Sequence, residues 1–172
     1  MDERDAEGYT VAYRRDDIAF PVVVMAILAV GCVAAAFFTG QAFWLIFGVA
    51  GAAATYHNLP LLEKGRPTIG ANQYGIFVQG LGLIRWRAVE RIDLVQTAGR
   101  SMTLYELQIA LTAALGSALV VDWRRRPLHR LLMRLPWSMA GSTIVRVNLD
   151  AFDSSPEEVH RTILRMWRYY RS

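Results

Sequence analysis

The chain has 172 residues, a formal net charge of +4 at pH 7, a hydrophobic content of 53% and a single cysteine, Cys32. One cysteine excludes an internal disulfide framework and a thiolate metal cluster. The sequence shows no zinc-finger, RNA-recognition or helix-turn-helix pattern, so we expect no nucleic-acid partner.

Residues 1–17 form a polar stretch with six acidic residues and three arginines. A secretory signal begins instead with a short positive stretch, and no small-residue cleavage site follows the apolar run here. We therefore interpret residues 1–17 as a polar N-terminal tail and expect the apolar segment after it to be retained.

A long uncharged run follows this tail. No charged side chain occurs between Asp17 and Glu63, and the turn-forming residues 39–41 lie at the midpoint. Each half is about 20 residues long, the length of an α-helix that spans roughly 30 Å of hydrocarbon. The pattern predicts a two-helix transmembrane hairpin over residues 18–64.

The flanking charges predict how this hairpin is oriented. Arg14 and Arg15 precede it, Lys64 and Arg66 follow it, and the central turn carries no cation. The positive-inside rule then places both chain ends in the cytoplasm. We expect a multi-pass membrane protein.

Small residues recur at helical spacing within the hairpin and let helix backbones approach closely. The predicted packing positions are Gly31, Ala35, Gly48 and Ala52. The polar cluster 56–58 stands out, because a transmembrane histidine can ligate haem or a pigment, which makes His57 a weak metal candidate. Its place just before Pro60 favours instead a contact with headgroups or with another helix.

After residue 65 the pattern changes to short β-type runs separated by Gly and Asn. The predicted strands are 67–71, 75–79, 83–87, 91–96, 102–111, 117–122 and 143–149. So many short strands in a small domain indicate a curved sheet or barrel. Trp86 ends one of these strands, and we expect it to anchor the core.

The chain closes with a well-marked helix, predicted over residues 155–171. Ser155 is placed as the N-cap, Pro156 as the first helical residue and Glu158 as the capping-box residue. One apolar stripe of this helix should cover the open side of the sheet.

A basic insertion, residues 122–141, separates the last two predicted strands. It contains five arginines between two tryptophans: Trp123, Arg124, Arg125, Arg126, Arg130, Arg134 and Trp137. Arginines, leucines and interfacial tryptophans suit the cytoplasmic headgroup layer. We interpret these residues as a membrane-surface or partner contact, and the alternative is a loop packed on its own domain with solvated arginines.

Three runs carry a resemblance to a known family: PTIGANQYGI (67–76), GLIRWRAVERI (82–92) and GSTIVRVNLDAFDSSPEEV (141–159). Together with the order of elements, they resemble a bacterial family with two membrane helices followed by a pleckstrin-homology-like (PH-like) domain. The resemblance implies an α+β membrane protein whose residues 65–172 form a cytoplasmic, PH-like, seven-strand curved sheet or barrel capped by the C-terminal helix. It implies a fold far more than an activity.

No nucleophile-base pair, paired carboxylates, H-E-x-x-H motif or glycine-rich phosphate loop occurs in a convincing context. We therefore expect no enzyme and no cofactor. The expected function is a non-catalytic adaptor, assembly factor or accessory subunit of a membrane complex, with membrane lipids and a membrane protein as partners; a homo-oligomer is also compatible. The alternatives are an anionic-lipid-binding or lipid-sensing protein and, more remotely, a haem or pigment carrier through His57.

Overall fold

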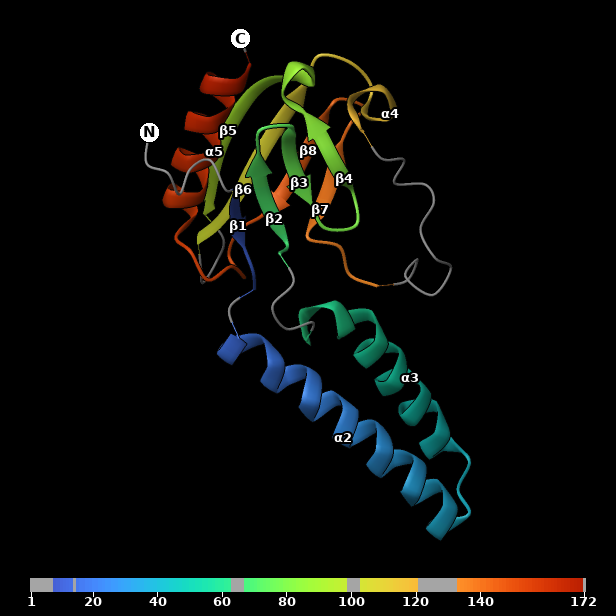
Figure 1. Cartoon of the computed structure of the whole chain (residues 1–172). Helices are drawn as coiled ribbons and strands as arrows, with labels where there is room; N and C mark the ends of the chain where they lie inside the picture. Colours follow the sequence, from blue (N-terminus) through green and yellow to red (C-terminus); the bar gives the residue numbers. More distant parts are fainter. Residues whose placement is uncertain (1–7, 14, 63–66, 99–102, 121–132, 172) are drawn as a thin grey trace. The chain divides into compact units, whose positions relative to one another are not determined.

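The computed structural model describes residues 8–13, 15–62, 67–98, 103–120 and 133–171 (Figure 1). The chain is an α+β protein with two antiparallel sheets, and it divides into two compact units. One unit contains the apolar helices. The other contains all the described strands and the C-terminal helix.

The apolar unit is built from α2 (Arg15–Thr39), α3 (Phe43–Asn58) and the 3₁₀ helix η1 (Leu59–Leu62). α2 ends where the Thr39 hydroxyl donates to the Ala35 carbonyl oxygen at 2.7 Å, and Gly40 adopts a φ of +65°. A left-handed φ is accessible to glycine at little cost, so the chain reverses there.

Only α2 among the described helices is long and apolar enough to cross a membrane by length and composition, over Phe20–Thr39. The sequence predicted two membrane-spanning helices; α2 has the length and composition of one, and α3 does not reach the same length. α3 has 16 residues, about 24 Å of helix, which is shorter than the hydrocarbon layer. Pro60 lacks the N–H that a continuing α-helix needs, and the chain tightens into η1 around it.

The first sheet has the order β1-β2-β3-β4. Its strands are β1 (Tyr9–Val11), β2 (Ile69–Asn72), β3 (Gly75–Val78) and β4 (Gly82–Arg85). β1 pairs antiparallel with β2, with Tyr9 opposite Ala71 and Val11 opposite Ile69. The sequence placed β1 in a polar tail, whereas Val11 is only 4% exposed and belongs to the core.

The second sheet has the order β5-β6-β8-β7. Its strands are β5 (Val89–Ala98), β6 (Thr103–Leu111), β7 (Trp137–Ala140) and β8 (Ile144–Asn148). The 3₁₀ helix η2 (Trp86–Ala88) connects β4 to β5. The two sheets remain separate four-stranded sheets, so the barrel prediction is wrong in the sense of a closed barrel.

The strand predicted over residues 117–122 is also wrong for residues 117–120; residues 121 and 122 lie outside the described residues. Leu115–Ala118 form the short helix α4, in which Ser117 donates both its N–H and its hydroxyl to the Ala114 carbonyl oxygen. Leu119 makes only an isolated bridge to Ile84. The place beside β6 is taken by β8, and β7, which the sequence analysis had assigned to the basic insertion, pairs with β8.

The core lies between the inward faces of the two sheets and the helix α5 (Pro156–Tyr170). Ile76, Ile109 and Val147 are completely buried strand residues, and Val159 and Ile163 of α5 pack with them. The predicted N-cap is confirmed, because the Ser155 hydroxyl accepts the Glu158 N–H at 3.2 Å and Pro156 follows the cap. This cap sets the start of a helix whose apolar stripe completes the core.

Trp86 is confirmed as a core residue, with 3% exposure. Its indole N–H donates to the Asn72 carbonyl oxygen at 2.8 Å. The Asn72 side chain in turn accepts the backbone N–H groups of Tyr74 and Gly75. The turn between β2 and β3 is thus bonded to the start of the connection between the two sheets.

Gly70 tests the attachment of β1. A Cβ at this position would lie 2.7 Å from the Tyr9 carbonyl oxygen, so Gly70→Ala should push β1 from β2 and destabilise the domain by about 1–3 kcal/mol. Hydrogen exchange should rise at the Thr68 amide, which bonds to Val11, while β6 keeps its protection. Ser138→Ala, an exposed change in β7, is the control; unchanged exchange in Gly70→Ala would contradict this pairing.

Candidate functional site

The outer surface of the hairpin is apolar on all sides. Phe37 and Phe38 of α2 are 85% and 91% exposed, and Ile46 of α3 is 70% exposed. Most of the large exposed hydrophobic side chains of the described chain lie on these two helices. A water-soluble surface rarely carries so large a continuous apolar area, so this surface is the first candidate for an interaction site.

The contact between α2 and α3 uses a register that the sequence analysis identified only in part. Val22, Ala29 and Ala36 are the buried residues of α2, spaced seven apart along one stripe. On α3, Gly48 is buried, and a Cβ on Gly51 would lie 3.0 Å from Ala29 Cβ. Small residues therefore let the helices meet along a coiled-coil-like seam.

Of the four predicted packing positions, Gly48 lies in this seam. Ala35 is half-buried, whereas Gly31 and Ala52 are exposed, with open space around Gly31. Both helices are apolar all round, so hydrophobicity does not mark which side faces the other helix. Gly51 and Ala29 were missed for this reason, although the seven-residue spacing in α2 was readable.

Gly51→Leu should separate the two helices, because the new side chain would meet the backbone of Ala29. We expect a loss of about 1–3 kcal/mol, measured as a lower midpoint of thermal unfolding in mild detergent by circular dichroism. Gly31→Leu is the matched control and should leave the midpoint unchanged, since nothing lies within 4 Å of that position. Equal effects of the two changes would refute the seam.

A groove runs along one side of the hairpin between the helices. Met25, Leu28 and Cys32 of α2 face it, and α3 contributes Phe43, Trp44, Phe47 and the small residues Ala50, Gly51 and Ala54. Its lining is almost entirely apolar, which suits an acyl chain or an apolar helix and offers no group for acid-base chemistry.

Most of the predicted basic contact lies outside the described residues, namely Trp123, Arg124, Arg125, Arg126 and Arg130. Arg134 is described and exposed. Its backbone N–H donates to the carbonyl oxygen of His57 at 2.7 Å, in the last turn of α3. Within the apolar unit, the end of the insertion is therefore bonded to the end of the hairpin.

Trp137, the second tryptophan of the insertion, is a sheet residue in the structure. It opens β7, lies opposite Val147 and is half-buried against the core cluster. A side chain packed in this way contributes mainly to the fold. The β-type alternation of Trp137–Ala140 was overlooked because the preceding arginines and leucines suggested one amphipathic segment.

His57 is exposed near the end of α3, with Tyr56 and Asn58 half-buried beside it. The Asn58 side chain donates to the Ala54 carbonyl oxygen at 2.9 Å, a bond within the helix. In the part of the chain that is described, no three residues of the types His, Cys, Asp and Glu gather as a metal site would require. A haem or pigment could still take a single axial histidine, so His57 stays a weak candidate.

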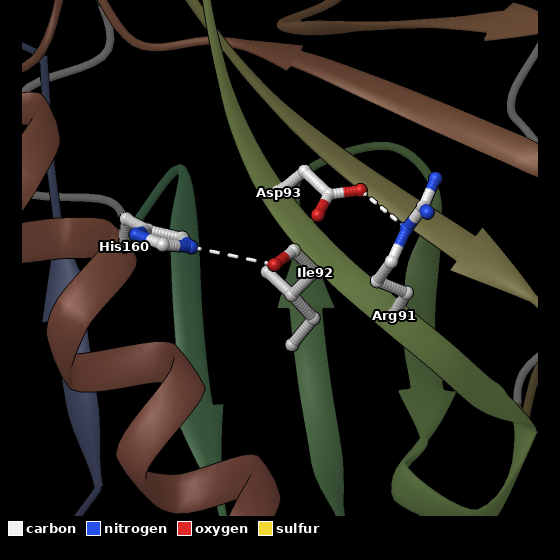
Figure 2. A network of polar contacts seen from close by, with 4 residues as sticks. All are labelled: Arg91, Ile92, Asp93 and His160. Atoms are coloured by element: carbon white, nitrogen blue, oxygen red, sulfur yellow. Dashed lines mark hydrogen bonds and ion pairs between the residues drawn. The ribbon is translucent and has the colours of Figure 1, made fainter.

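The outer edge of β5 is covered by side chains of α5. His160 Nε2 lies 3.3 Å from the carbonyl oxygen of Ile92, and Figure 2 shows the imidazole directed at the strand backbone. Farther along, the Trp167 indole N–H donates to the Val89 carbonyl oxygen at 3.2 Å. α5 thus covers an edge of β5 that would otherwise be open to another strand.

Figure 2 also shows an ion pair on β5, in which Arg91 Nε lies 2.6 Å from Asp93 Oδ2. Both side chains are solvent-accessible, so this ion pair contributes little to stability.

No protein family, curated protein or solved structure matches this sequence. Three features of the chain bear on its function: the apolar hairpin, the place of that hairpin in the chain between β1 and β2, and the bond between Arg134 and His57.

Proposed function

We propose that this chain is a non-catalytic integral protein of a bacterial inner membrane, anchored by a hairpin that crosses the bilayer twice. Its α+β domain, which we take to be PH-like, acts on the cytoplasmic side as an adaptor, assembly factor or accessory subunit of a membrane complex. The single observation that carries this proposal is the pairing of β1 with β2.

β1 precedes the hairpin in the chain and β2 follows it, yet the two strands are hydrogen-bonded neighbours. Paired strands must lie on the same side of a membrane. The chain that leaves β1 and returns to β2 therefore crosses the bilayer an even number of times. If α2 crosses, α3 and η1 must cross back.

The same pairing argues against two other roles that the length and composition of α2 allow. A cleaved signal sequence would take β1 away with it, although Val11 is part of the domain core. A buried core helix would have its side chains covered, whereas Phe20, Ile27 and Val30 are 72%, 65% and 71% exposed. An interfacial helix would need one polar face, and α2 has none between Ile18 and Phe38.

α3 and η1 together are just long enough to cross the hydrocarbon layer. α3 has 16 residues and η1 has four, which gives about 24 Å of α-helix and about 8 Å of 3₁₀ helix. Their sum is about 32 Å, close to the thickness of the hydrocarbon layer. Polar His57 and Asn58 would then lie near the cytoplasmic headgroups.

The adaptor role is supported by how the domain is built. Its apolar side chains fill the space between two sheets and α5, and α5 covers one sheet edge. The outer face of the second sheet presents a polar row, Gln108, Arg146 and Ser138, in which the latter two are exposed. Such a face offers a rigid contact surface for a partner protein at the membrane.

Labels at the two chain ends test this topology. Reporters that distinguish cytoplasm from periplasm, fused before Met1 and after Ser172, should both report the cytoplasm, and one in the 39–41 turn should report the periplasm. Both ends in the periplasm would reverse the orientation but keep the two crossings. Ends on opposite sides would overturn the proposal.

A second candidate function, binding of anionic lipid, is favoured by one specific contact. The bond from the Arg134 N–H to the His57 carbonyl oxygen holds the end of the basic insertion at the end of α3. If that end of α3 lies at the headgroups, Arg134 lies there too. Each cation near an anionic surface contributes roughly 1 kcal/mol.

This second function can be tested on a water-soluble variant. The paired part of β1 ends at Val11, opposite Ile69, so the two strand ends are neighbours, and a short glycine-containing linker in place of residues 14–66 should join them in a hairpin. The variant should bind vesicles containing about one third phosphatidylglycerol and lose that binding toward about 0.5 M salt. Vesicles of phosphatidylcholine alone should not bind.

A matched pair of variants locates the charge that is responsible. Changing Arg124, Arg125, Arg126, Arg130 and Arg134 to glutamine should abolish the binding. The control changes five arginines elsewhere to glutamine, and it should keep most of the binding: Arg146, Arg161, Arg165, Arg168 and Arg171. Equal losses in both variants would show a general charge effect and would refute a role for the insertion.

A further inference from the structure

The two helices of the hairpin differ in polarity where they lie level with each other. A Cβ on Gly51 of α3 would lie 3.0 Å from Ala29 Cβ of α2, and the two helices run antiparallel (Figure 1). His57, six residues after Gly51, is therefore level with Val23, six residues before Ala29. Val23 is apolar and 46% exposed, whereas His57 is exposed and polar.

Beside α2, the apolar surface continues beyond this level. Phe20 is 72% exposed, and the first charged residue met toward the start of the helix is Asp17. Asp17 lies six residues before Val23, which corresponds to about 9 Å of α-helix. On this side, the hydrocarbon can therefore extend about 9 Å past the level of His57.

Beside α3, irregular backbone lies at the level of His57. The Arg134 N–H donates to the His57 carbonyl oxygen at 2.7 Å, and both residues belong to the apolar unit. Met133 and Arg134 are part of neither a helix nor a strand, and Arg134 is exposed. Irregular backbone is not stable in contact with lipid chains, because hydrocarbon offers its peptide groups no hydrogen-bond partner. A long cationic side chain can reach a distant headgroup, but its backbone cannot.

Tilt of the hairpin accounts for only part of this difference. The axes of packed helices are roughly 8–10 Å apart, and a transmembrane helix is tilted by about 20° on average. Such a tilt shifts two neighbouring helices by about 3 Å relative to each other along the membrane normal. The polar boundary beside α3 lies about 9 Å nearer the turn than the boundary beside α2, so about 6 Å is left for the bilayer itself.

We propose that the bilayer is thinner beside α3 than beside α2, and that lipid headgroups and water reach inward there to the level of His57 and Arg134. This inference rests on the proposal that the hairpin crosses the membrane twice. It gives the hairpin a role besides anchoring, which is local deformation of the leaflet on the side away from the turn. A membrane protein partner that packs on this side fits best if its own helix has a short apolar stretch.

Nitroxide labels on the full chain test this boundary, in vesicles of dioleoylphosphatidylcholine and with Cys32→Ser to remove the native thiol. Labels on Leu59→Cys and Phe20→Cys lie at nearly the same level, and the native side chains are 41% and 72% exposed. A water-soluble nickel chelate should collide with the label at position 59 about threefold more often than with the label at position 20. Equal collision rates would overturn the proposal.

Further labels separate this result from failure of the proposed function and from tilt. A label on Ile27→Cys, inside the apolar run, should be shielded from the chelate; free access there would show that the hairpin is not inserted and would overturn both proposals. Labels on Phe37→Cys and Phe43→Cys lie level beside the turn and should have equal access. A lower rate at position 43, matching the gain at position 59, would show a rigid tilt and would refute thinning.

Bilayer thickness provides a second test of the same labels. In the thinner vesicles of dimyristoleoylphosphatidylcholine, the headgroups beside α2 should reach Phe20, so chelate access there should rise to the value at position 59. Access at position 59 should change little, because the boundary beside α3 is already held at that level. Unchanged access at position 20, or an equal rise at both positions, would contradict local thinning.

Discussion

The hydrogen-bonded pairing of β1 with β2 is the constraint on which the rest of the structure depends. It joins residues on either side of the apolar hairpin into one sheet, with Tyr9 opposite Ala71. The first sheet can form only after both helices have been synthesised, because β2, the partner of β1, follows them in the chain. Separation of β1 from β2 would open the core around Val11. A few backbone hydrogen bonds of the first sheet thereby hold together the two chain segments that flank the hairpin.

The hairpin itself is held by close approach of its backbones. In lipid, apolar side chains gain nothing by leaving their surroundings for another apolar surface, so contact between helices depends on packing. Ala29 and Gly51 supply that packing by leaving room for the chains to meet. The larger side chains, such as Phe37 and Ile46, point outward. This division of roles suits a helix pair surrounded by acyl chains.

α5 holds the two sheets of the domain together by packing, as the seam holds α2 against α3. Its buried stripe closes the core, and Trp167 and His160 reach carbonyl groups on the edge of β5. Its exposed side is cationic, and β1 lies next to its start. The N-terminal strand, the helix and both sheets therefore form a single packed unit.

The sequence by itself determined the elements that have a local signal. The uncharged run marks the apolar hairpin, and Ser155 before Pro156 marks the start of α5. Alternation of apolar and polar residues marks the strands from β2 to β6 and β8. Tertiary structure alone decided three other features. β1 is three residues long and becomes a strand only because β2 offers it backbone partners, and β7 does so beside β8. Residues 117–118 have strand-like neighbours but enter α4, and the position beside β6 is taken by β8. Gly51, rather than Gly31, lies at the helix contact, because a helix that is apolar on every side carries no hydrophobic signal of its rotation.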